Sequence, residues 1–424
     1  MTALALKVYQ ISATLLLPFI TCALVVRSFK QREYRQYIGQ RLGFCPKKIP
    51  AGGIIIHGSS LGEITALKPF IELSLKELPE YSITVTCFTP AGRQQIINLL
   101  GGRVNYAYLP IDSPPCNALF LHRLKPKAIV FMETEIWPSL IAQAHKRGIQ
   151  QILINARLSE RSVKNYQKIS ALITPTLKKL NGIYPQSDDD KKRFELLGAN
   201  NYSCQTLGNL KYDLKLNTAL LPAISVIKKQ LEGRCVWVIG SSHEDEEDML
   251  LDIAAHLVHA NPHLLVVIAP RHKERFKCLA EKLDAHGLAW VSRGAHTVPT
   301  KLTKIWLIDT LGELLTFYGA ADICTVAGSF GHAGGHNPVE PALFKKCITF
   351  GPNMQNAQSL ATGLLIANAA RQDSNTEELA LTIQRLIKNT EERCALGQNA
   401  GQFLSSNSGA TEKNIMKLKA LLAD

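Results

Sequence analysis

The sequence predicts an α/β fold made of two Rossmann-like domains, each built on a parallel β-sheet. Beyond residue 52, short β-rich runs alternate with helical stretches, a pattern that is typical of parallel sheets with right-handed crossovers. Two similar segments, HGSSLGE at 57–63 and IGSSHEDEE at 239–247, each follow a β-rich run and open a helix, as the first βα unit of a domain would. The 424 residues are also too many for one ordinary core and fit two domains.

The expected domains are residues 29–215 and 216–424, after an N-terminal segment at 1–28. Their boundary falls near 208–232, where LGNLKYD leads into a Pro-containing, weakly patterned stretch. The expected strands are continuous apolar runs, as buried parallel strands usually are, and lie at 52–57, 82–88, 128–133, 151–155, 182–185, 235–240, 263–269, 305–308, 322–327 and 347–350. Helices are expected after most of them, for example at 64–77, 91–100, 138–147, 244–258 and 338–345. In two doubly wound domains that face each other across a cleft, the sites lie at the carboxyl ends of the strands.

The N-terminal segment predicts a membrane-anchor helix. Residues 11–26 (ISATLLLPFITCALVV) carry no charge, and the apolar run extends back to Ala3 with interruptions at Lys7 and Gln10. Its length is near the roughly 20 residues that span a bilayer. Pro18 lies in mid-run, so shallow insertion remains an alternative to a full span. A buried core helix is the structural alternative, and no small-x-small cleavage site supports a signal peptide.

The segment that follows the apolar run is strongly basic. Between residues 27 and 48 it carries a single acid, Glu33, and seven basic residues, namely Arg27, Lys30, Arg32, Arg35, Arg41, Lys47 and Lys48. By the positive-inside rule the rest of the chain is cytoplasmic. The cluster also predicts binding to the anionic lipids of the inner membrane. The formal net charge of +13 alone would also fit a nucleic-acid partner, but no RNA- or DNA-binding module is recognisable, so none is expected.

The ten cysteines predict neither a zinc site nor a disulfide framework. No two of them form a C-x-x-C pair, and Cys87 and Cys324 lie inside apolar strand-like runs. Buried reduced thiols of a cytoplasmic protein are the expected state.

The strongest local signal for chemistry is a glycine-rich loop at 328–336, which follows the expected strand at 322–327. It runs into Asn337, Pro338, Val339 and Glu340. Asn337 is a good N-cap, Pro338 fits the first helical position, and Glu340 has the spacing of a capping box. A glycine loop that ends at a helix N-terminus predicts a phosphate site. Binding of ribose hydroxyls by Glu340 is an alternative role for that residue. A purely structural turn is the alternative.

Two histidines of this loop, His332 and His336, have the spacing of a metal-binding pair. They lie in a loop and have no evident third ligand, so no metal is expected.

Two other strand ends in the second half fit the same edge of the sheet. Pro270 and Arg271 end the run VVIAP, where an arginine can hold a phosphate or carboxylate through two hydrogen bonds. A surface ion pair between Arg271 and Glu274 is the alternative. Leu311, Gly312 and Glu313 follow the run IWLI and open another helix. This pattern alone does not indicate a function.

In the first half, Glu63 begins a helix directly after HGSSLG. A carboxylate in a cleft can act as a general base on an acceptor hydroxyl, while capping of the helix is an equally good interpretation. Acidic Glu133 and Glu135 in METEIWP, Asn155 in NARLS and Lys211 in GNLKYD lie at further strand ends or at the domain junction. Taken singly, each of these residues is more often structural.

Together these segments resemble a known family. HGSSLGE, FTPAGR, METEIWP, NARLS, GNLKYD, APRHKERF, DTLGEL and GGHNPVEP occur in order over about residues 35–355 and are similar to 3-deoxy-D-manno-octulosonic acid (Kdo) transferases. The resemblance implies a GT-B fold with an amino-terminal membrane anchor and no metal or other cofactor. It implies transfer of Kdo from CMP-Kdo to the 6′-hydroxyl of the tetra-acylated lipid A precursor lipid IVA, with inversion, in lipopolysaccharide biosynthesis.

The resemblance also implies roles for individual residues. Glu63 matches the general base of the family, and Glu133 with Lys211 matches its transition-state-stabilising pair. The CMP-binding segments correspond to Pro270, Arg271, Leu311, Gly312, Glu313, Asn337, Pro338, Val339 and Glu340. Departures are mild, with SLGE where SVGE is usual and Leu311 where Met is common, and they remove no functional group. Another GT-B glycosyltransferase that uses a different nucleotide sugar is the alternative function, and a non-catalytic lipid- or nucleotide-binding protein is a third.

Overall fold

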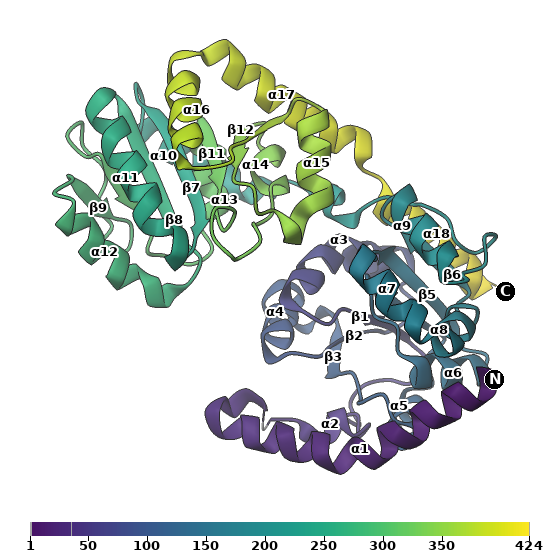
Figure 1. Cartoon of the computed structure of the whole chain (residues 1–424). Coiled ribbons are helices and arrows are strands. Elements are labelled where there is room, and N and C mark those ends of the chain that lie inside the picture. The colour runs from purple at the N-terminus through teal and green to yellow at the C-terminus, as the bar shows by residue number, and fades with distance from the viewer. Residues whose placement is uncertain (1, 35, 424) are drawn as a thin grey trace. The chain divides into compact units, whose positions relative to one another are not determined.

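The chain folds into two compact units, each with its own parallel β-sheet. A computed structural model describes residues 2–34 and 36–423 (Figure 1). The first unit runs to Asp213 and takes up the chain again from Asn407, and the second unit comprises Leu214–Ser406. Every strand pair in both sheets is parallel, which confirms the predicted pair of Rossmann-like domains.

The first sheet has the strand order β3-β2-β1-β4-β5-β6. Its strands are β1 (Ile54–His57), β2 (Ile83–Cys87), β3 (Asn105–Tyr108), β4 (Ala128–Met132), β5 (Gln150–Ala156) and β6 (Gly182–Pro185). Because side chains alternate along a strand, Ile54 and Ile56 enter the core on one face while Ile55 enters the core on the other. Both faces are thus buried, which explains the continuous apolar runs.

Helices cover both faces of the first sheet. One core includes residues of α3 (Leu61–Glu77), α4 (Pro90–Leu100) and α18 (Ala410–Ala423), and the other includes residues of α5 (Pro114–Leu124), α6 (Pro138–Lys146), α8 (Ser170–Leu177) and α9 (Asp188–Leu196). The remaining helical segments of this unit are α1 (Thr2–Lys30), η1 (Arg32–Tyr34), α2 (Ile38–Arg41), η2 (Gly101–Arg103), α7 (Glu160–Lys168) and η3 (Leu210–Asp213).

The second sheet has the strand order β13-β12-β11-β7-β8-β10-β9. Its strands are β7 (Cys235–Ser242), β8 (Leu264–Pro270), β9 (Trp290–Ser292), β10 (Ile305–Leu307), β11 (Ile323–Val326), β12 (Cys347–Phe350) and β13 (Ala370–Gln372). Its helices are η4 (Thr218–Leu220), α10 (Leu221–Gln230), α11 (Glu244–Ala260), η5 (Lys273–Arg275), α12 (Phe276–Ala285), α13 (Leu314–Ala320), α14 (Val339–Leu343), η6 (Gln355–Ala357), α15 (Gln358–Ile366), α16 (Thr376–Lys388) and α17 (Thr390–Asn407). The HGSSLGE and IGSSHEDEE segments join β1 to α3 and β7 to α11, as predicted.

Three strands were not predicted, and all three are edge strands. Strand β3 lies at one edge of the first sheet, and β9 and β13 form the two edges of the second. Their sequences NYAY, WVS and ARQ contain polar or partly exposed residues. An edge strand is covered less completely than a central one, so it lacks the continuous apolar run on which the prediction depended.

The C-terminal helix departs from the expected domain boundary. The range 216–424 assigned it to the second domain, but α18 packs on the first unit, where Ile415 and Leu418 join the core beside α3. The carboxylate of Asp213 accepts hydrogen bonds from the backbone N–H groups of Gly409 and Thr411, at 2.6 and 2.5 Å. The chain therefore leaves the first unit after residue 213 and returns to it near residue 407.

The basic segment after residue 26 is only partly a surface feature. The guanidinium of Arg41 is buried, lies 4.1 Å from the ring centroid of Tyr108 and donates to the Phe88 carbonyl oxygen at 2.8 Å. Its assignment to a headgroup-binding cluster is therefore wrong, whereas Lys47 and Lys48 are exposed. Arg35 and the side chains of Lys30 and Arg32 lie outside the described part of the chain.

Helix α1 is long and apolar enough over Ala3–Phe29 to cross a membrane. Its apolar window is not buried inside the protein, so the alternative of a buried core helix is wrong. The helix continues through Pro18 and contacts α5, α6 and α8 of the first unit (Figure 1).

All ten cysteines are free, and Cys87 and Cys324 are buried as expected.

Candidate active site

The reversal of strand order in the first sheet lies between β1 and β4, and two of the predicted residues follow these strands. Glu63 lies in the first turn of α3, directly after β1, and Glu133 is the first residue after β4. In open α/β sheets, ligands bind beside the carboxyl ends of the strands at such a switch point. The topology therefore brings these two carboxyl groups to the edge where a ligand is expected.

Glu63 is held by the start of its own helix. Its two carboxylate oxygens accept hydrogen bonds from the backbone N–H of Ser59 and the hydroxyl of Ser60, both at 2.9 Å. The Ser60 hydroxyl in turn accepts from the Glu63 N–H at 3.3 Å. The capping interpretation thus describes the observed contacts, and it also fixes the orientation of the carboxylate.

The electrostatics of Glu63 set it apart from an ordinary capping residue. Burial raises the pKa of Glu63 to about 7, and the negative charges of Glu133 and Glu135 add to the effect, while the hydrogen bonds from Ser59 and Ser60 oppose it. A carboxylate with a pKa near neutrality is well matched to proton abstraction from a hydroxyl.

Lys211 joins this group from a distant part of the sequence. Its Nζ lies 3.6 Å from Oε1 of Glu133, and both side chains are mostly buried, at 21% and 13% exposure. Glu133 has a positive φ of 55°, a conformation that costs free energy for a residue with a side chain. The structure therefore brings together the three residues assigned to catalysis in the first unit.

A network of amide side chains positions the turn that carries Lys211. Asn155, at the end of β5, accepts a hydrogen bond from the Leu210 N–H at 2.9 Å, and Asn209 accepts from the Lys211 N–H at 3.0 Å. Gln186 links the two asparagines, since it accepts from Asn209 and donates to the Asn155 carbonyl oxygen. Asn155, which the sequence left as a probable structural residue, thus anchors η3 against the sheet.

Glu135 belongs to a second charged group that the sequence analysis did not assign. Its Oε2 lies 3.1 Å from Nε2 of the buried His57 and accepts from the indole N–H of Trp137 at 2.8 Å. Nδ1 of His57 lies 3.0 Å from the Thr86 hydroxyl, and Trp137 stacks on Phe88. In the sequence, the indication of this group is His57, the histidine that ends the apolar run of β1.

In the second unit, the glycine-rich loop follows β11, beside β7 at the switch point of that sheet. Two carboxylates at the start of α11 hold it. Glu246 accepts hydrogen bonds from the N–H groups of Gly328 and Phe330, and Asp245 accepts from the His332 N–H. The sequence analysis predicts only that IGSSHEDEE opens a helix, as HGSSLGE does, and not that its acids hold the glycine-rich loop.

Gly328 has a φ of +72°, and a Cβ there would lie 2.9 Å from the imidazole of His336. Nε2 of His336 is 2.8 Å from Nε2 of His243, so the N–H of one ring donates a hydrogen bond to the nitrogen of the other. Burial lowers the pKa of His336 to about 4, and the positive charge of Arg271 contributes. Among residues 2–34 and 36–423, no group of three His, Cys, Asp or Glu is placed to hold a metal ion.

Arg271 and Glu340 lie near each other. Burial raises the pKa of Glu340 to about 7, and the charge of Arg271 opposes this rise. Arg271 is exposed, and its N–H donates to the Ser242 carbonyl oxygen at 3.0 Å. No ion pair with Glu274 forms in the described part of the chain, so the surface-pair alternative is not observed.

The cap of the helix after the glycine loop differs from the prediction. Oδ1 of Asn337 accepts a hydrogen bond from the Val339 N–H at 3.2 Å, but the N-cap residue is Pro338, which has no side-chain cap, so the predicted N-cap is one residue too early. The helix α14 begins at Val339 instead of Pro338 and ends at Leu343, two residues early. Glu340 forms no capping-box hydrogen bond among the residues described, which leaves its carboxyl group beside Arg271.

The third segment assigned to CMP lies after β10. Leu311 is 70% exposed and Gly312 has a φ of +84°. The carboxylate of Glu313 is bound by Arg293 through Nε at 3.2 Å and Nη2 at 2.7 Å, and this hydrogen-bonded pairing lowers the pKa of Glu313. The Glu313 side chain is therefore engaged within the protein.

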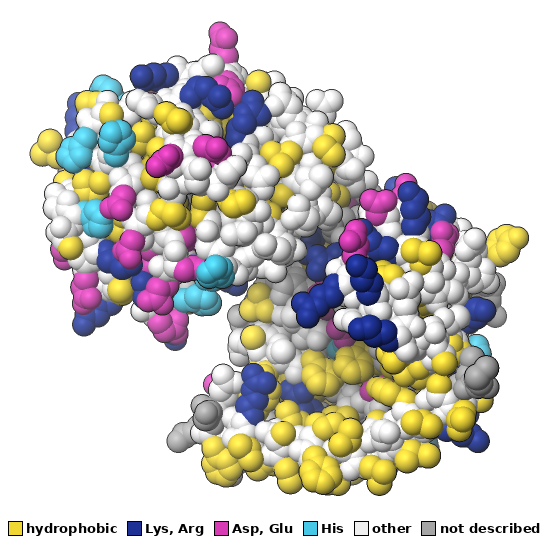
Figure 2. Space-filling model, in the orientation of Figure 1, with side chains coloured by type: hydrophobic (Ala, Val, Ile, Leu, Met, Phe, Trp, Pro, Cys, Tyr) yellow, Lys and Arg dark blue, Asp and Glu magenta, His cyan; other side chains and the backbone are white. Residues whose placement is uncertain are grey.

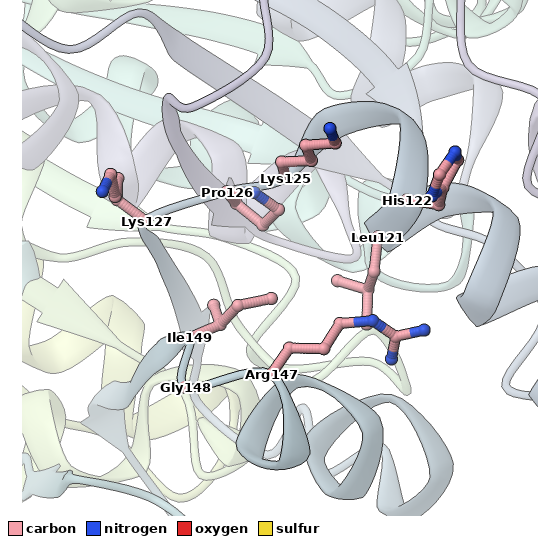
Figure 3. A pocket seen from close by; sticks show the side chains of 8 residues that line it. All are labelled: Leu121, His122, Lys125, Pro126, Lys127, Arg147, Gly148 and Ile149. Carbon is pink, nitrogen blue, oxygen red and sulfur yellow. The ribbon is translucent and has the colours of Figure 1, made fainter.

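A separate hollow of about 420 Å³ lies at the amino ends of β4 and β5, at the opposite edge of the first sheet. Lys125, Lys127 and Arg147 line it, together with His122 (Figure 3). Lys125 and Arg147 are the residues at which α5 and α6 end, so their charges complement the carbonyl ends of these helices. None of the assigned catalytic residues lines this hollow.

Solved structures of similar architecture show which fold the chain has. A putative UDP-N-acetylglucosamine 2-epimerase from Listeria monocytogenes matches with a TM-score of 0.59 and 13% identity, over 87% of this chain and 96% of that chain. A glycosyltransferase from Rickettsia africae matches with a TM-score of 0.58 and 11% identity, over 88% and 99%. The chain therefore has the GT-B fold.

Relatives in sequence identify the family. The family model for 3-deoxy-D-manno-octulosonic-acid transferase (kdotransferase) matches residues 36–214. A 3-deoxy-D-manno-octulosonic acid transferase from Haemophilus influenzae is 34% identical over 412 residues, which cover 96% of both chains. One from Bordetella pertussis is 30% identical and covers 91% of this chain and 92% of its own. The chain belongs to the Kdo transferase family.

Proposed function

We propose that this Kdo transferase uses CMP-Kdo as donor and lipid IVA as acceptor, at the cytoplasmic face of the inner membrane. The observation that carries the proposal is the group formed by Glu63, Glu133 and Lys211 at the switch point of the first sheet. It combines a carboxylate whose pKa is raised to about 7 with a mostly buried ion pair. These groups are suited to act as a general base and as a charge-stabilising pair in a single displacement reaction.

In this reaction Glu63 accepts the proton of the acceptor hydroxyl as its oxygen attacks the anomeric carbon of Kdo. The bond from that carbon to the phosphate oxygen breaks, and CMP leaves with the electron pair. Attack opposite to the leaving group inverts the anomeric centre. The Glu133–Lys211 pair stabilises the charge that develops at the oxocarbenium-like centre, because its mostly buried setting strengthens electrostatic interactions.

The second unit supplies the groups proposed to bind CMP. Arg271 offers an exposed guanidinium for phosphate or carboxylate, and Glu340 offers a carboxyl group for ribose hydroxyls. The backbone of Leu311, Gly312 and Asn337 borders the same carboxyl edge of the sheet, where Pro338 directly precedes Val339, the first residue of α14. The carboxylate of Glu313 is bound to Arg293, so in this proposal Glu313 contributes to CMP binding only by its position at the start of α13.

Membrane association is supported by α1, which is long and apolar enough to enter a bilayer. Exposed Lys47 and Lys48 follow it and are suited to anionic headgroups. Both features fit an acceptor that is itself a phosphorylated lipid.

The test is a transfer assay in membrane extracts with CMP-Kdo and radiolabelled lipid IVA. Wild type should convert the acceptor to glycosylated lipid and release CMP, whereas Glu63→Gln should not. Glu72→Gln, an exposed substitution on the same helix, is the matched control and should retain activity. Release of UDP from a UDP-sugar, without use of CMP-Kdo, would instead support the alternative of another GT-B transferase.

A further inference from the structure

Helix α1 packs lengthwise along the first unit. Its less exposed positions recur every three or four residues and therefore form one stripe along the helix, made of Leu6, Tyr9, Gln10, Ala13, Leu17, Thr21, Leu24 and Ser28. The stripe faces the unit, because α1 contacts α5, α6, α8 and η1. Because α5, α6 and α8 are parts of the first unit that are distant from α1 in sequence, α1 lies against this unit and does not project away from it.

Two side-chain hydrogen bonds hold this side of α1 against the first unit. The hydroxyl of Tyr9 donates to Oδ2 of Asp112 at 2.9 Å, and the Gln10 amide donates to the Ser139 hydroxyl at 3.4 Å. Asp112 is 5% exposed and also accepts from the N–H groups of Ser139 and Leu140 at the start of α6. If α1 moved away, the buried Asp112 would lose one of its partners and Tyr9 would have to find another.

The opposite face of α1 is mostly apolar, although Lys7, Ser12, Thr14 and Arg27 are also exposed. It exposes ten large hydrophobic side chains at 36–74% of their area, namely Leu4, Val8, Ile11, Leu15, Leu16, Phe19, Ile20, Val25, Val26 and Phe29. Figure 2 shows hydrophobic side chains along the length of this helix. A helix on the surface of a water-soluble protein has the reverse order, with apolar residues facing inward. Here half of the inward stripe is polar (Tyr9, Gln10, Thr21 and Ser28), while ten large hydrophobic side chains point outward, so the outer face fits a hydrocarbon environment.

We propose that α1 lies in the plane of the membrane, with its outer face in one leaflet, and does not cross the bilayer. A helix of 27 residues is roughly 40 Å long, against a hydrocarbon core of about 30 Å. If α1 spanned this core while it kept its contacts, α5, α6 and α8 would enter the hydrocarbon with their polar groups, which is unfavourable. This inference rests on the membrane association proposed above.

The in-plane arrangement has a consequence for the active site. Gln10 contacts Ser139, and Ser139 lies two residues after Trp137 in the segment that carries Glu133 and Glu135. The membrane-bound helix therefore lies next to the loop that holds the acidic groups of the site. An acceptor lipid can then present its sugar to this loop while its acyl chains stay in the leaflet.

The orientation is tested with epitope tags at the two ends of the full-length chain. In inverted inner-membrane vesicles, whose cytoplasmic face is outside, the proposal expects protease to remove both tags without detergent. An N-terminal tag that is protected until detergent is added, beside a C-terminal tag that is removed, would overturn it in favour of a spanning helix. If the chain is absent from the membrane fraction, the membrane association fails and this inference fails with it.

A pair of matched variants tests the apolar face itself. Leu15 on α1 is 68% exposed and Leu381 on α16 is 67% exposed. Leu15→Glu should lower the fraction bound to vesicles of phosphatidylglycerol and phosphatidylethanolamine several-fold, while Leu381→Glu should not change it. Equal binding of the two variants would contradict the proposal. So would a soluble wild-type oligomer that Leu15→Glu converts to monomer, because the face would then be an interface between copies of the chain.

Discussion

Nζ of Lys211 lies 3.6 Å from Oε1 of Glu133, although 78 positions separate the two residues in the sequence. Glu133 follows a central strand, whereas Lys211 sits in a short 3-10 turn at the end of the first unit. The amide groups of Asn155, Gln186 and Asn209 connect that turn to the sheet. The pair is thus positioned by hydrogen bonds of neighbouring residues and not only by its own attraction.

Replacing Lys211 by methionine should abolish most of the activity. The substitution keeps the length of the side chain but removes the charge next to Glu133, so stabilisation of the transition state is lost. Removal of one such group typically lowers kcat by about 10²–10³-fold. The measurement is the initial rate of Kdo transfer at saturating CMP-Kdo, together with the thermal denaturation midpoint to verify folding.

Lys215→Met provides the matched control for this experiment. Lys215 is exposed four residues further along the chain, outside the site. The Lys215→Met variant should retain wild-type activity. Near-normal kcat in Lys211→Met would show that the lysine has no role in stabilising the transition state.

The dependence of activity on pH should report the ionisation of Glu63. Its pKa is raised to about 7, and a general base must be deprotonated, so kcat/KM should rise with pH and level off above that value. Because the negative charge of Glu135 contributes to the raised pKa, Glu135→Gln should move the acidic limb to lower pH. Rates are measured between about pH 5 and 9, the range that brackets this ionisation.

Glu72→Gln is the control for the pH experiment, since Glu72 lies on the same helix and pairs with Lys68 and Arg103 at the surface. Its profile should coincide with that of wild type. If the acidic limb of the Glu135→Gln profile stays at the wild-type pH, the ionisation that limits activity does not belong to Glu63.

Asp213→Asn should destabilise the first unit. The carboxylate accepts hydrogen bonds from two backbone N–H groups, of Gly409 and Thr411, and so fastens the returning C-terminal segment. The loss of charge and of one acceptor at a buried position costs about 1–3 kcal/mol of unfolding free energy. Denaturant unfolding measures it, with Asp189→Asn as control because the Asp189 side chain is 75% exposed. Equal stability of the two variants would mean that the C-terminal segment is held by its apolar contacts alone.

His336 should remain neutral well below the pH at which histidine usually gains a proton. Burial and the nearby charge of Arg271 lower its pKa to about 4. Titration of its ring signals by NMR should therefore show no protonation above about pH 5, one unit above that pKa. Arg271→Gln should raise this pKa, because it removes a positive charge, while Lys273→Gln should not. A midpoint near pH 6.5 in wild type would contradict the buried His336–His243 contact.

The sequence by itself determined the parts of this protein that depend on local pattern. Continuous apolar runs marked the central strands, because parallel strands are buried on both faces, and motifs such as HGSSLGE marked the loops between strand and helix. The ordered motifs also led to the Kdo transferase family, which the relatives confirm. The assigned roles of individual site residues stay predictions.

The tertiary structure decided what depends on neighbours that are distant in the chain. It returned α18 to the first unit, buried Arg41 against Tyr108, and paired Glu313 with Arg293. It also set the raised pKa of Glu63, which arises from burial and from carboxylates about 70 residues away in sequence. Burial and electrostatic interactions act through space, so a pattern of neighbouring residues does not contain them. The direction in which each face of α1 points was decided in the same way.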